Sequence, residues 1–370
     1  MKKKMKGKDP LFLLSVFLII IIGIVMIASS SYPEGLAKFN NGLYFLKRHL
    51  VFLVLGLIIS WICSRISLQF IRKLSGLFFF ISLILCLLLY TKLGIDHWGS
   101  VRWLKIPILN MEFMPSDLIK FASIFYFTDF ILRHRNTIHQ METFIKILLI
   151  IGLSVGPIIF KDFSTGIVIG VSLLAIFYLM GIRLYQGGII VFLGGFATYL
   201  LLTLERFAYR KKRLLAFLDP FDDIPDTDWQ LAHSLYALGI GGFKGEGPFQ
   251  SRLKQGYLPL SYNDFIFPII GEEWGFIGTT TVLVLYFILC FRGYYFAIQA
   301  EDLYAKLVAV GITTSIGIQV FFNTGVAMGI LPVTGLPLPL ISYGGTSLIV
   351  TFAALGVLYG INRDPKGGRS

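Results

Sequence analysis

Seven ionisable side chains flank or interrupt the long apolar runs of this chain, and the sequence is most informative about chemistry at these positions. They are Arg48, Lys120, Lys161, Asp162, Asp264, Glu272 and Glu273. A charge at membrane depth costs about 2.5 kcal/mol or more, so it normally faces a protein interior or a water-filled cavity and marks a site or a pathway. With the amino terminus in the cytoplasm, all seven fall toward the outer side of the membrane. The sequence therefore predicts a polar cavity that opens outward.

Lys120 is the sharpest of these cases because it stands one turn inside a predicted helix. Pro115 fits the first helical position and Asp117 suits the positive end of the helix dipole, whereas a cation is disfavoured there. We therefore expect Lys120 to have an anionic partner. That partner is either a structural carboxylate, Asp264 or Asp162, or a bound phosphate, and the residues alone leave both open.

A second polar feature lies near the end of the chain. Residues Gly329 to Gly345 contain three prolines and four glycines among mostly apolar side chains, so a continuous helix is impossible there. Irregular backbone at membrane depth is tolerated only against protein or water. The sequence thus predicts a re-entrant outer loop, about residues 327–345, that lines the same cavity and offers the hydroxyls of Ser342 and Tyr343. A merely tight connection between two spans is the alternative.

The elements that position these residues are transmembrane helices. The 370 residues are 55% hydrophobic and only 15% charged, which excludes a soluble domain of this length. The fold class is an all-α polytopic membrane protein of about ten spans, with residues 1–370 as one membrane domain and a long outer loop at about 205–264. The predicted spans are Leu11–Ser30, Leu50–Ser64, Leu74–Tyr90, Leu118–Leu132, Ile147–Phe160, Gly166–Ile182, Gly188–Leu204, Trp274–Phe291, Leu307–Phe322 and Ile341–Ile361.

The distribution of basic residues predicts which side of the membrane each end occupies. Lys and Arg are frequent in the tails and in the short loops on the inner side, which places both termini in the cytoplasm. The basic outer segment 205–264 is weak evidence against this orientation. The net charge of +12 fits anionic headgroups or a phosphorylated substrate, and the membrane context excludes nucleic acid. Trp98 and Trp103 suit a membrane interface.

Several motifs of soluble enzymes are absent from the sequence. No zinc-ligand spacing and no Gly-x-Ser-x-Gly motif occurs. The glycine-rich stretch Leu238–Gly247 lacks the Gly-Lys-Ser/Thr ending of a phosphate loop, so it is interpreted as a flexible turn. The three cysteines all fall in apolar runs and indicate no disulfide framework.

Several ordered segments form one pattern over almost the whole chain. These segments are Phe45–His49, Arg102-Trp103, Phe113–Lys120, Asp162–Thr165, Ser234–Gly239, Tyr257–Pro259, Asp264–Phe267, Gly271–Gly275 and Leu331–Gly345. The pattern resembles the FtsW/RodA/SpoVE (SEDS) family of cell-wall glycan polymerases. Five residues depart from the family's usual Gln, Pro, Gln, Glu and His, which indicates a divergent member: Met114, Lys161, His233, Leu260 and Tyr262. Segments Thr334–Pro337 and Arg213–Pro220 favour the FtsW/SpoVE branch.

The resemblance implies a peptidoglycan glycosyltransferase that polymerises lipid II into β-1,4 glycan strands, for cell division or cell shape. The 4-hydroxyl of one lipid II displaces the pyrophosphate of a lipid-linked glycan with inversion. A carboxylate suits the removal of the hydroxyl proton, and Asp264 is the candidate general base. Cationic groups suit the departing pyrophosphate, and Arg48, Arg102 and Lys120 are the candidates. Asp162, Ser342 and Tyr343 are the further candidate substrate contacts.

The resemblance also implies partners and leaves a metal site open. Asp162 and Glu272 either bind a divalent cation, Mg or Mn, or pair with basic residues. The expected partners are undecaprenyl-pyrophosphate-linked glycan, a class B penicillin-binding transpeptidase and other divisome or elongasome membrane proteins, all at the bacterial cytoplasmic membrane. A lipid-linked precursor flippase is the alternative function, since charged sites between broken helices also serve transport. A non-catalytic scaffold is a third alternative.

Overall fold

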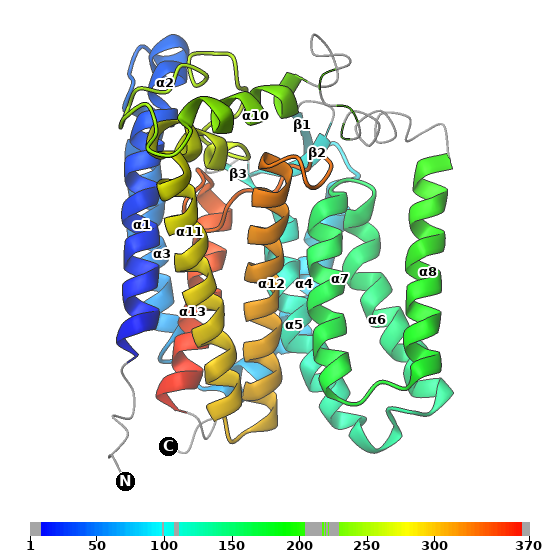
Figure 1. The fold of residues 1–370 in the computed structure, drawn as a ribbon. Helices are drawn as coiled ribbons and strands as arrows, with labels where there is room; N and C mark the ends of the chain where they lie inside the picture. The colour runs from blue at the N-terminus through cyan, green and yellow to red at the C-terminus, as the bar shows by residue number, and fades with distance from the viewer. Residues whose placement is uncertain are drawn as a thin grey trace.

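The computed structural model describes residues 9–97, 100–106, 111–203 and 229–364, with the single residues 217, 219 and 221. Ten helices run roughly along one axis, and both ends of the chain lie at the same end of this bundle (Figure 1). They are α1 (Pro10–Ser30), α3 (Tyr44–Cys63), α4 (Leu68–Leu88), α5 (Pro115–Arg133), α6 (Met141–Ile159), α7 (Phe163–Leu179), α8 (Leu184–Thr203), α11 (Ile266–Gln299), α12 (Leu303–Ala327) and α13 (Gly345–Arg363).

The bundle confirms the prediction of a polytopic helical membrane protein. Within the described residues, seven helices are long and apolar enough to cross a membrane: α1, α3, α4, α6, α11, α12 and α13. Helices α5, α7 and α8 occupy the three remaining predicted spans. Several predicted starts are wrong: α3, α4 and α6 each begin six residues before the predicted Leu50, Leu74 and Ile147. The largest error is at α11, which begins at Ile266, before the charged pair Glu272-Glu273 that had delayed its predicted start. Helix α13 begins four residues later than predicted, at Gly345, after the extended residue Gly344.

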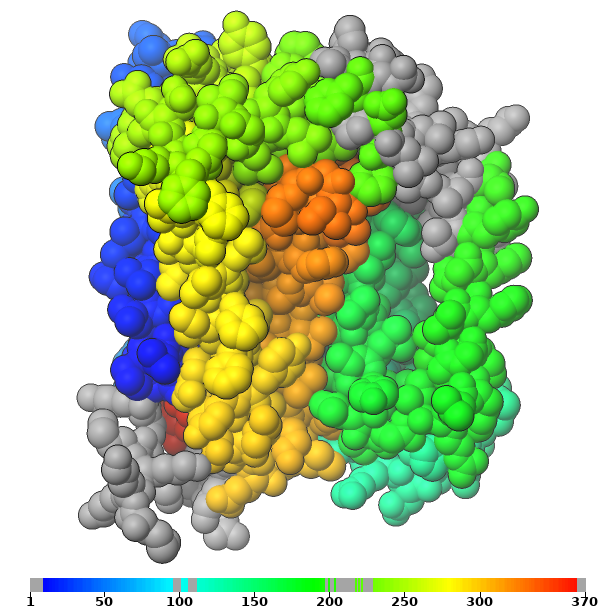
Figure 2. All heavy atoms as spheres, viewed as in Figure 1, coloured from blue at the N-terminus to red at the C-terminus, as the bar shows by residue number. Residues whose placement is uncertain are grey.

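A layer of shorter elements, called the outer layer below, covers the end of the bundle away from the termini (Figure 1). It contains α2 (Tyr32–Phe39), α10 (Trp229–Gly241) and an antiparallel sheet of β1 (Gly94–His97), β2 (Ser100–Ile106) and β3 (Met111–Phe113), in the order β1-β2-β3. The one-turn helix η1 (Arg135–Thr137) joins α5 to α6 at the opposite end. In Figure 2 the segment that follows α10 packs over the ends of α1 and α11. Trp98 and most of Arg213–Pro220 lie outside the described residues.

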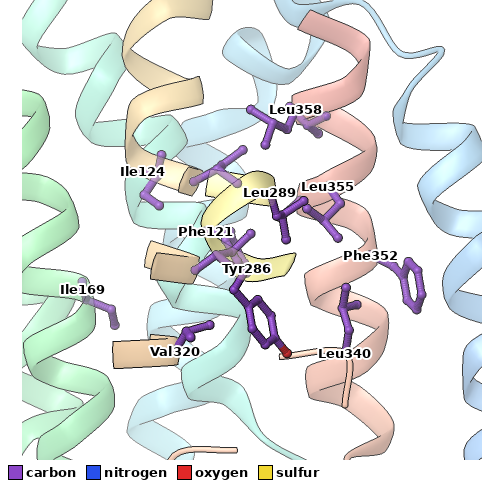
Figure 3. Close-up of a cluster of buried hydrophobic side chains, with 14 of the residues drawn as sticks. Phe121, Ile124, Ile169, Tyr286, Leu289, Val320, Leu340, Phe352, Leu355 and Leu358 are labelled. Carbon is purple, nitrogen blue, oxygen red and sulfur yellow. The ribbon is translucent and has the colours of Figure 1, made fainter. Parts of the chain in front are cut away.

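Helix α12 is the central element of the bundle. In its most apolar window 72% of the residues are buried, the largest share among the seven helices of the described chain that are long and apolar enough to cross a membrane. It packs against α5, α7 and α11, and the core around it joins side chains of five helices (Figure 3). Packing of this kind, rather than hydrophobic exclusion, stabilises helix association in lipid. Polar side chains on α12 are therefore held in fixed positions at the centre of the molecule.

Helix α11 carries a kink that fixes the outer layer. Gly275 has φ 66° and ψ −161°, which are not helical angles and which glycine adopts without steric cost. At this kink the turn after α10 approaches closely: Phe276 N donates to Gly242 O at 2.9 Å and Glu246 N to Glu272 O at 2.9 Å. The stretch predicted as a flexible turn, Leu238–Gly247, is only partly a turn: Leu238–Gly241 form the last turn of α10, and residues 242–247 form a turn packed on α11.

Helix α8 stands at the edge of the bundle (Figure 1). Among the described residues its contacts with other helices are sparse, and Val191 and Phe192 are exposed. Its apolar surface is of the kind that faces lipid.

Candidate functional site

A cavity of about 330 Å³ opens at the end of the bundle that carries the layer of α2, α10 and the sheet, within the size range of small-molecule sites. Five segments distant in sequence meet there: the start of α3, strands β2 and β3 with the first turn of α5, the residues before α11, the loop after α12, and the first turn of α13. Its lining residues are Phe45, Arg48, Phe52, Arg102, Trp103, Glu112, Met114, Asp117, Asn263, Asp264, Gly335, Pro337, Tyr343, Gly344, Gly345, Thr346 and Ser347.

Asp264 lies half-buried in this cavity, two residues before α11 begins. It belongs to an irregular segment, so helical hydrogen bonds do not fix it. Its backbone carbonyl accepts a hydrogen bond from Asn323 Nδ2 of α12 at 2.8 Å. The cavity therefore brings Asp264 together with Arg48, Arg102 and Tyr343, four of the residues that the sequence singled out.

The two arginines of the cavity are held differently. Arg48 of α3 is exposed, lies over the Tyr44 ring at 5.7 Å and donates to the Tyr44 hydroxyl at 3.2 Å. Arg102 of β2 is more enclosed. Its Nη1 donates to Gly335 O at 2.8 Å, and its Nη2 lies 3.8 Å from Asp162 Oδ1. Arg102 Nε is buried without a hydrogen-bond partner among the described residues, so one donor of this guanidinium is left unsatisfied.

Asp162 is not among the residues that line the cavity. It caps α7 instead: its carboxylate accepts from Thr165 N at 3.3 Å and from Thr165 Oγ1 at 2.6 Å. An Asp side chain is well suited to this position because it satisfies N–H groups of the first helical turn. In addition, its carboxylate lies beside the Arg102 guanidinium.

Lys120 is also placed differently from the prediction. Its side chain is buried and does not line the cavity, and its Nζ lies 3.3 Å from Asp117 Oδ1 and 2.8 Å from Gln319 Oε1. The anionic partner is therefore Asp117, one turn before it on the same helix, and neither Asp264 nor Asp162. The prediction missed this pairing because Asp117 already had an explanation at the positive end of the helix dipole.

The loop between α12 and α13, residues 328–344, is called the return loop below. It carries both predicted hydroxyls. The Ser342 hydroxyl is buried and fully used within the protein: it accepts from Leu338 N at 2.8 Å and donates to Asn263 O at 2.6 Å. Tyr343 lines the cavity, and its N–H donates to Tyr262 O at 2.9 Å. Burial raises the pKa of the Tyr343 phenol, and the nearby Arg48 charge opposes that rise, so the phenol is a hydrogen-bond donor at neutral pH.

Glu272 and Glu273 hold the outer layer and do not line the cavity. Glu272 accepts hydrogen bonds from the Ser251 hydroxyl and from the backbone of Arg252 and Leu253. Glu272 was predicted, together with Asp162, as a possible metal ligand, but these hydrogen bonds already occupy its carboxylate oxygens. Over the described residues, no group of three or more His, Cys, Asp or Glu side chains is placed to bind a metal ion. The residues present do not fit a metal shared by Asp162 and Glu272.

Sequence reasoning missed the first turn of α13 as part of the site. Gly344 to Ser347 line the cavity, and the N-cap Gly344 has no side chain to satisfy the first N–H groups. A helix N-terminus carries about half a positive charge and unpaired N–H donors, which suits an anion. The signal was present in Gly344-Gly345-Thr346-Ser347, directly before an apolar run. Glu112 and Asn263 are further lining residues that the sequence did not indicate.

The cavity thus combines positive groups with carboxylates. Arg48, Arg102 and the start of α13 can bind a polyanionic group, and Asp264 can accept a proton from a hydroxyl placed beside it. An arrangement of this kind can transfer a group away from a phosphate leaving group to a hydroxyl acceptor.

Comparison with known proteins gives a consistent result along the chain. The family model FTSW_RODA_SPOVE, described as cell cycle protein, matches residues 9–367. The chain is 34% identical over 343 residues to the probable peptidoglycan glycosyltransferase FtsW of Coxiella burnetii, covering 91% of each chain. It is 36% identical over 368 residues to the stage V sporulation protein E of Bacillus subtilis, covering 98% of this chain and 99% of that protein.

The fold is similar to that of solved structures. One is a chain from a peptidoglycan synthase complex described as coordinating polymerization and crosslinking; it superposes with a TM-score of 0.77 at 26% sequence identity, over 96% of this chain and 98% of that one.

Proposed function

The chain belongs to the FtsW/RodA/SpoVE family and is a peptidoglycan glycosyltransferase, and we propose that Asp264 is the general base with which it extends a glycan strand. The observation that supports this most directly is the cavity in which Asp264 lies with Arg48, Arg102 and the start of α13. The donor is a lipid-pyrophosphate-linked glycan and the acceptor is the 4-hydroxyl of lipid II.

In the reaction, the acceptor oxygen bonds to the anomeric carbon of the donor while the bond from that carbon to the phosphate oxygen breaks. The hydroxyl proton passes to the Asp264 carboxylate, and the bonding electrons leave with the lipid pyrophosphate. Attack on the face opposite the α-phosphate gives a β-1,4 bond, so the transfer inverts the configuration. General-base catalysis of this kind contributes about 10²- to 10⁴-fold to a rate.

The departing pyrophosphate gains negative charge, and the cavity offers groups that stabilise it. The Arg102 guanidinium presents a planar set of donors, which suits phosphate oxygens better than a lysine ammonium does. Arg48 adds a second positive charge at the cavity mouth, and the first N–H groups of α13 add donors that are fixed before substrate arrives. The neutral phenol of Tyr343 donates to the substrate without competing for the proton that Asp264 accepts.

Three of the residues expected to contact substrate are assigned other roles. Asp162 supports Arg102, Ser342 ties the return loop to Asn263, and Lys120 neutralises Asp117, which lines the cavity. Their loss would disturb the site through their neighbours.

The whole chain acts as one membrane domain of the bacterial cytoplasmic membrane, with the cavity on the outer face and both termini in the cytoplasm. Its partner is a class B penicillin-binding transpeptidase, which crosslinks the glycan that this chain makes; a related chain is known from a synthase complex that couples these two activities. The work of the complex serves cell division or cell shape, together with other divisome or elongasome proteins.

The test is polymerisation of labelled lipid II by the purified full chain in detergent, with and without its cognate transpeptidase. Wild type should give glycan ladders on a gel, and Asp264→Asn and Asp264→Ala should lower the rate by about 10²-fold or more. The matched control is Glu142→Gln at the other end of the molecule, where an exposed ion pair with Lys146 contributes little. Undiminished ladders from Asp264→Asn would contradict the assignment of the base. Movement of lipid II across liposomes without polymer would favour a flippase.

A further inference from the structure

Three consecutive carbonyls of the return loop each accept a hydrogen bond from a side chain of another element. Gly335 O accepts from Arg102 and Leu336 O accepts from Asn323 Nδ2 at 2.7 Å. Pro337 O accepts from Gln319 Nε2 at 2.8 Å. Prolines in this segment have no N–H to donate, so the loop cannot build its own ladder. Side chains from outside the loop therefore supply the hydrogen-bond donors to these three carbonyls.

Asn323 holds a second segment at the same time. The same Nδ2 group donates to Asp264 O at 2.8 Å, so one amide joins the backbone of the proposed base to the return loop. Both acceptors are carbonyl oxygens, which determines that the nitrogen and not the oxygen of this amide faces them. The Asn323 Oδ1 is buried without a partner among the described residues, so the contacts of this side chain are those made by its donors.

Gln319 lies one turn before Asn323 on α12, and a hydrogen bond from Lys120 fixes the orientation of its side-chain amide. Lys120 Nζ donates to Gln319 Oε1 at 2.8 Å, which leaves Nε2 to face the return loop. Lys120 in turn pairs with Asp117. Residues four apart on a helix share one face. Helix α12 therefore presents two oriented amides to the two irregular segments of the site.

We propose that Gln319 and Asn323, called the amide clamp, are positioning residues that hold Asp264 and the return loop in register for catalysis. This inference rests on the proposed function of Asp264. Neither segment is helical, whereas catalytic groups must stay within about 0.5 Å of their productive positions. The clamp meets that need because it projects from α12, which packs against α5, α7 and α11 and is largely buried in the described part of the chain. It acts through the peptide backbone and touches no reacting atom.

Four purified full-length variants test the clamp: Asn323→Ala, the near-isosteric Asn323→Asp, Gln319→Glu, and Thr324→Val as the control. Thr324 is equally buried on α12, but its hydroxyl only donates to Val320 O of its own helix, at 2.9 Å. We expect kcat for lipid II polymerisation to fall by about 10- to 100-fold in the clamp variants, with a smaller change in KM, because misplacement by about 1 Å has an effect of that size. Thr324→Val should retain wild-type kcat.

Hydrogen exchange measured by mass spectrometry reports on the order of the backbone and does not depend on the glycosyl-transfer reaction. In Asn323→Ala, exchange should rise together in peptides covering residues 258–265 and 336–343, while the helices keep their protection. If only one segment or neither responds, the clamp does not exist. Should Asn323→Ala fail to accumulate, Asn323→Asp and Gln319→Glu carry the same test, because they keep side-chain volume and remove donors facing the carbonyls.

The outcomes separate the clamp from the assignment of the base. Faster exchange in both segments with unchanged kcat would overturn the positioning role. If Asp264→Asn polymerises normally while Asn323→Ala still loosens both segments and lowers kcat, the clamp stands and the base is another residue. Loss of kcat with wild-type exchange and with a fall in the amount of folded protein would show that Asn323 only stabilises the fold.

Discussion

Arg102 connects a strand, a loop and a helix cap through a single guanidinium. It donates to Gly335 O and lies beside Asp162, and its Nε is left for a ligand or for water. The contacts of Nη1 and Nη2 therefore fix the orientation of the planar guanidinium. A substrate phosphate would meet a group whose orientation is set before binding, which is the condition under which electrostatic stabilisation is most effective.

The close packing of Gly335 against Arg102 gives a test at the level of one methyl group. A Cβ on Gly335 would lie 2.2 Å from Arg102 Nη1, so Gly335→Ala must displace the guanidinium. We expect kcat/KM for polymerisation to fall about 10²-fold in Gly335→Ala, similarly to Arg102→Lys, which lacks the planar fork. Gly156→Ala is the control, since its Cβ would meet nothing within 4 Å. Normal kinetics in Gly335→Ala would show that Arg102 tolerates another position.

Tyr262 predicts how stability depends on alkaline pH. Its hydroxyl donates to Glu34 Oε1 at 3.2 Å, and burial, followed by the negative charge of Glu34, raises the pKa of this phenol. The unfolded chain loses the phenol proton near pH 10, whereas the folded chain keeps it to higher pH. This contribution to stability is therefore complete below about pH 10 and is lost as the pH rises through the folded pKa. We expect Tm to fall as the pH rises above about 10, and to fall less in Tyr262→Phe; equal falls would contradict the linkage.

At the scale of elements, the outer layer is fixed to the bundle by buried charge. Lys254 Nζ lies 2.8 Å from Glu273 Oε1 and donates to Ser29 Oγ of α1 at 2.7 Å, and Phe249 N donates to Glu273 Oε2 at 3.0 Å. The segment between α10 and α11, which ends at Asp264, is thus attached to two spanning helices.

Breaking this pair should be costly because a buried charge would lose its partner. Glu273→Gln is expected to lower stability by about 3–5 kcal/mol, and the double variant Lys254→Met with Glu273→Gln to recover most of it. Thermal unfolding in detergent measures both effects. Glu246→Gln is the matched control, since its pair with the exposed Arg252 should contribute about 1 kcal/mol or less. Equal effects of Glu273→Gln and Glu246→Gln would mean that the buried pair does not stabilise the layer.

The elements themselves were largely predictable, and their contacts were not. Long apolar runs located the spans, because lipid admits only helices there. Charges displaced the predicted start of α11 furthest, since Glu272 and Glu273 lie inside α11 with partners from a loop. The partners of Lys120 show why contacts resist prediction: Gln319 is 199 residues away and uncharged, so no pattern in the sequence connects the two. The segments that form β1 to β3 show no clear alternation of apolar and polar residues, so the sequence did not predict these strands.

At the scale of the whole molecule, the residues proposed to catalyse the reaction all lie at one end of the bundle. The return loop and the outer layer lie at the end of the bundle opposite the two termini (Figure 1). Residues of the return loop, Gly335, Pro337 and Tyr343, line the cavity. An even number of spans requires both termini to be on the same side, and the basic tails favour the cytoplasm. Lipid II and the growing strand would therefore meet the cavity on the outer face, where a crosslinking partner can reach the product.

Cysteine labelling of intact cells tests this orientation directly. Gln250 is exposed in the outer layer and Asn136 is exposed in the turn between α5 and α6, at the opposite end. A membrane-impermeant maleimide should label Gln250→Cys in intact cells and Asn136→Cys only after lysis. The unsubstituted chain gives the background, since Cys63, Cys86 and Cys290 all lie in spanning helices. The reverse pattern would place Asp264 in the cytoplasm, where an outward-facing polymerase could not use it, so this experiment decides on which side of the membrane the proposed reaction takes place.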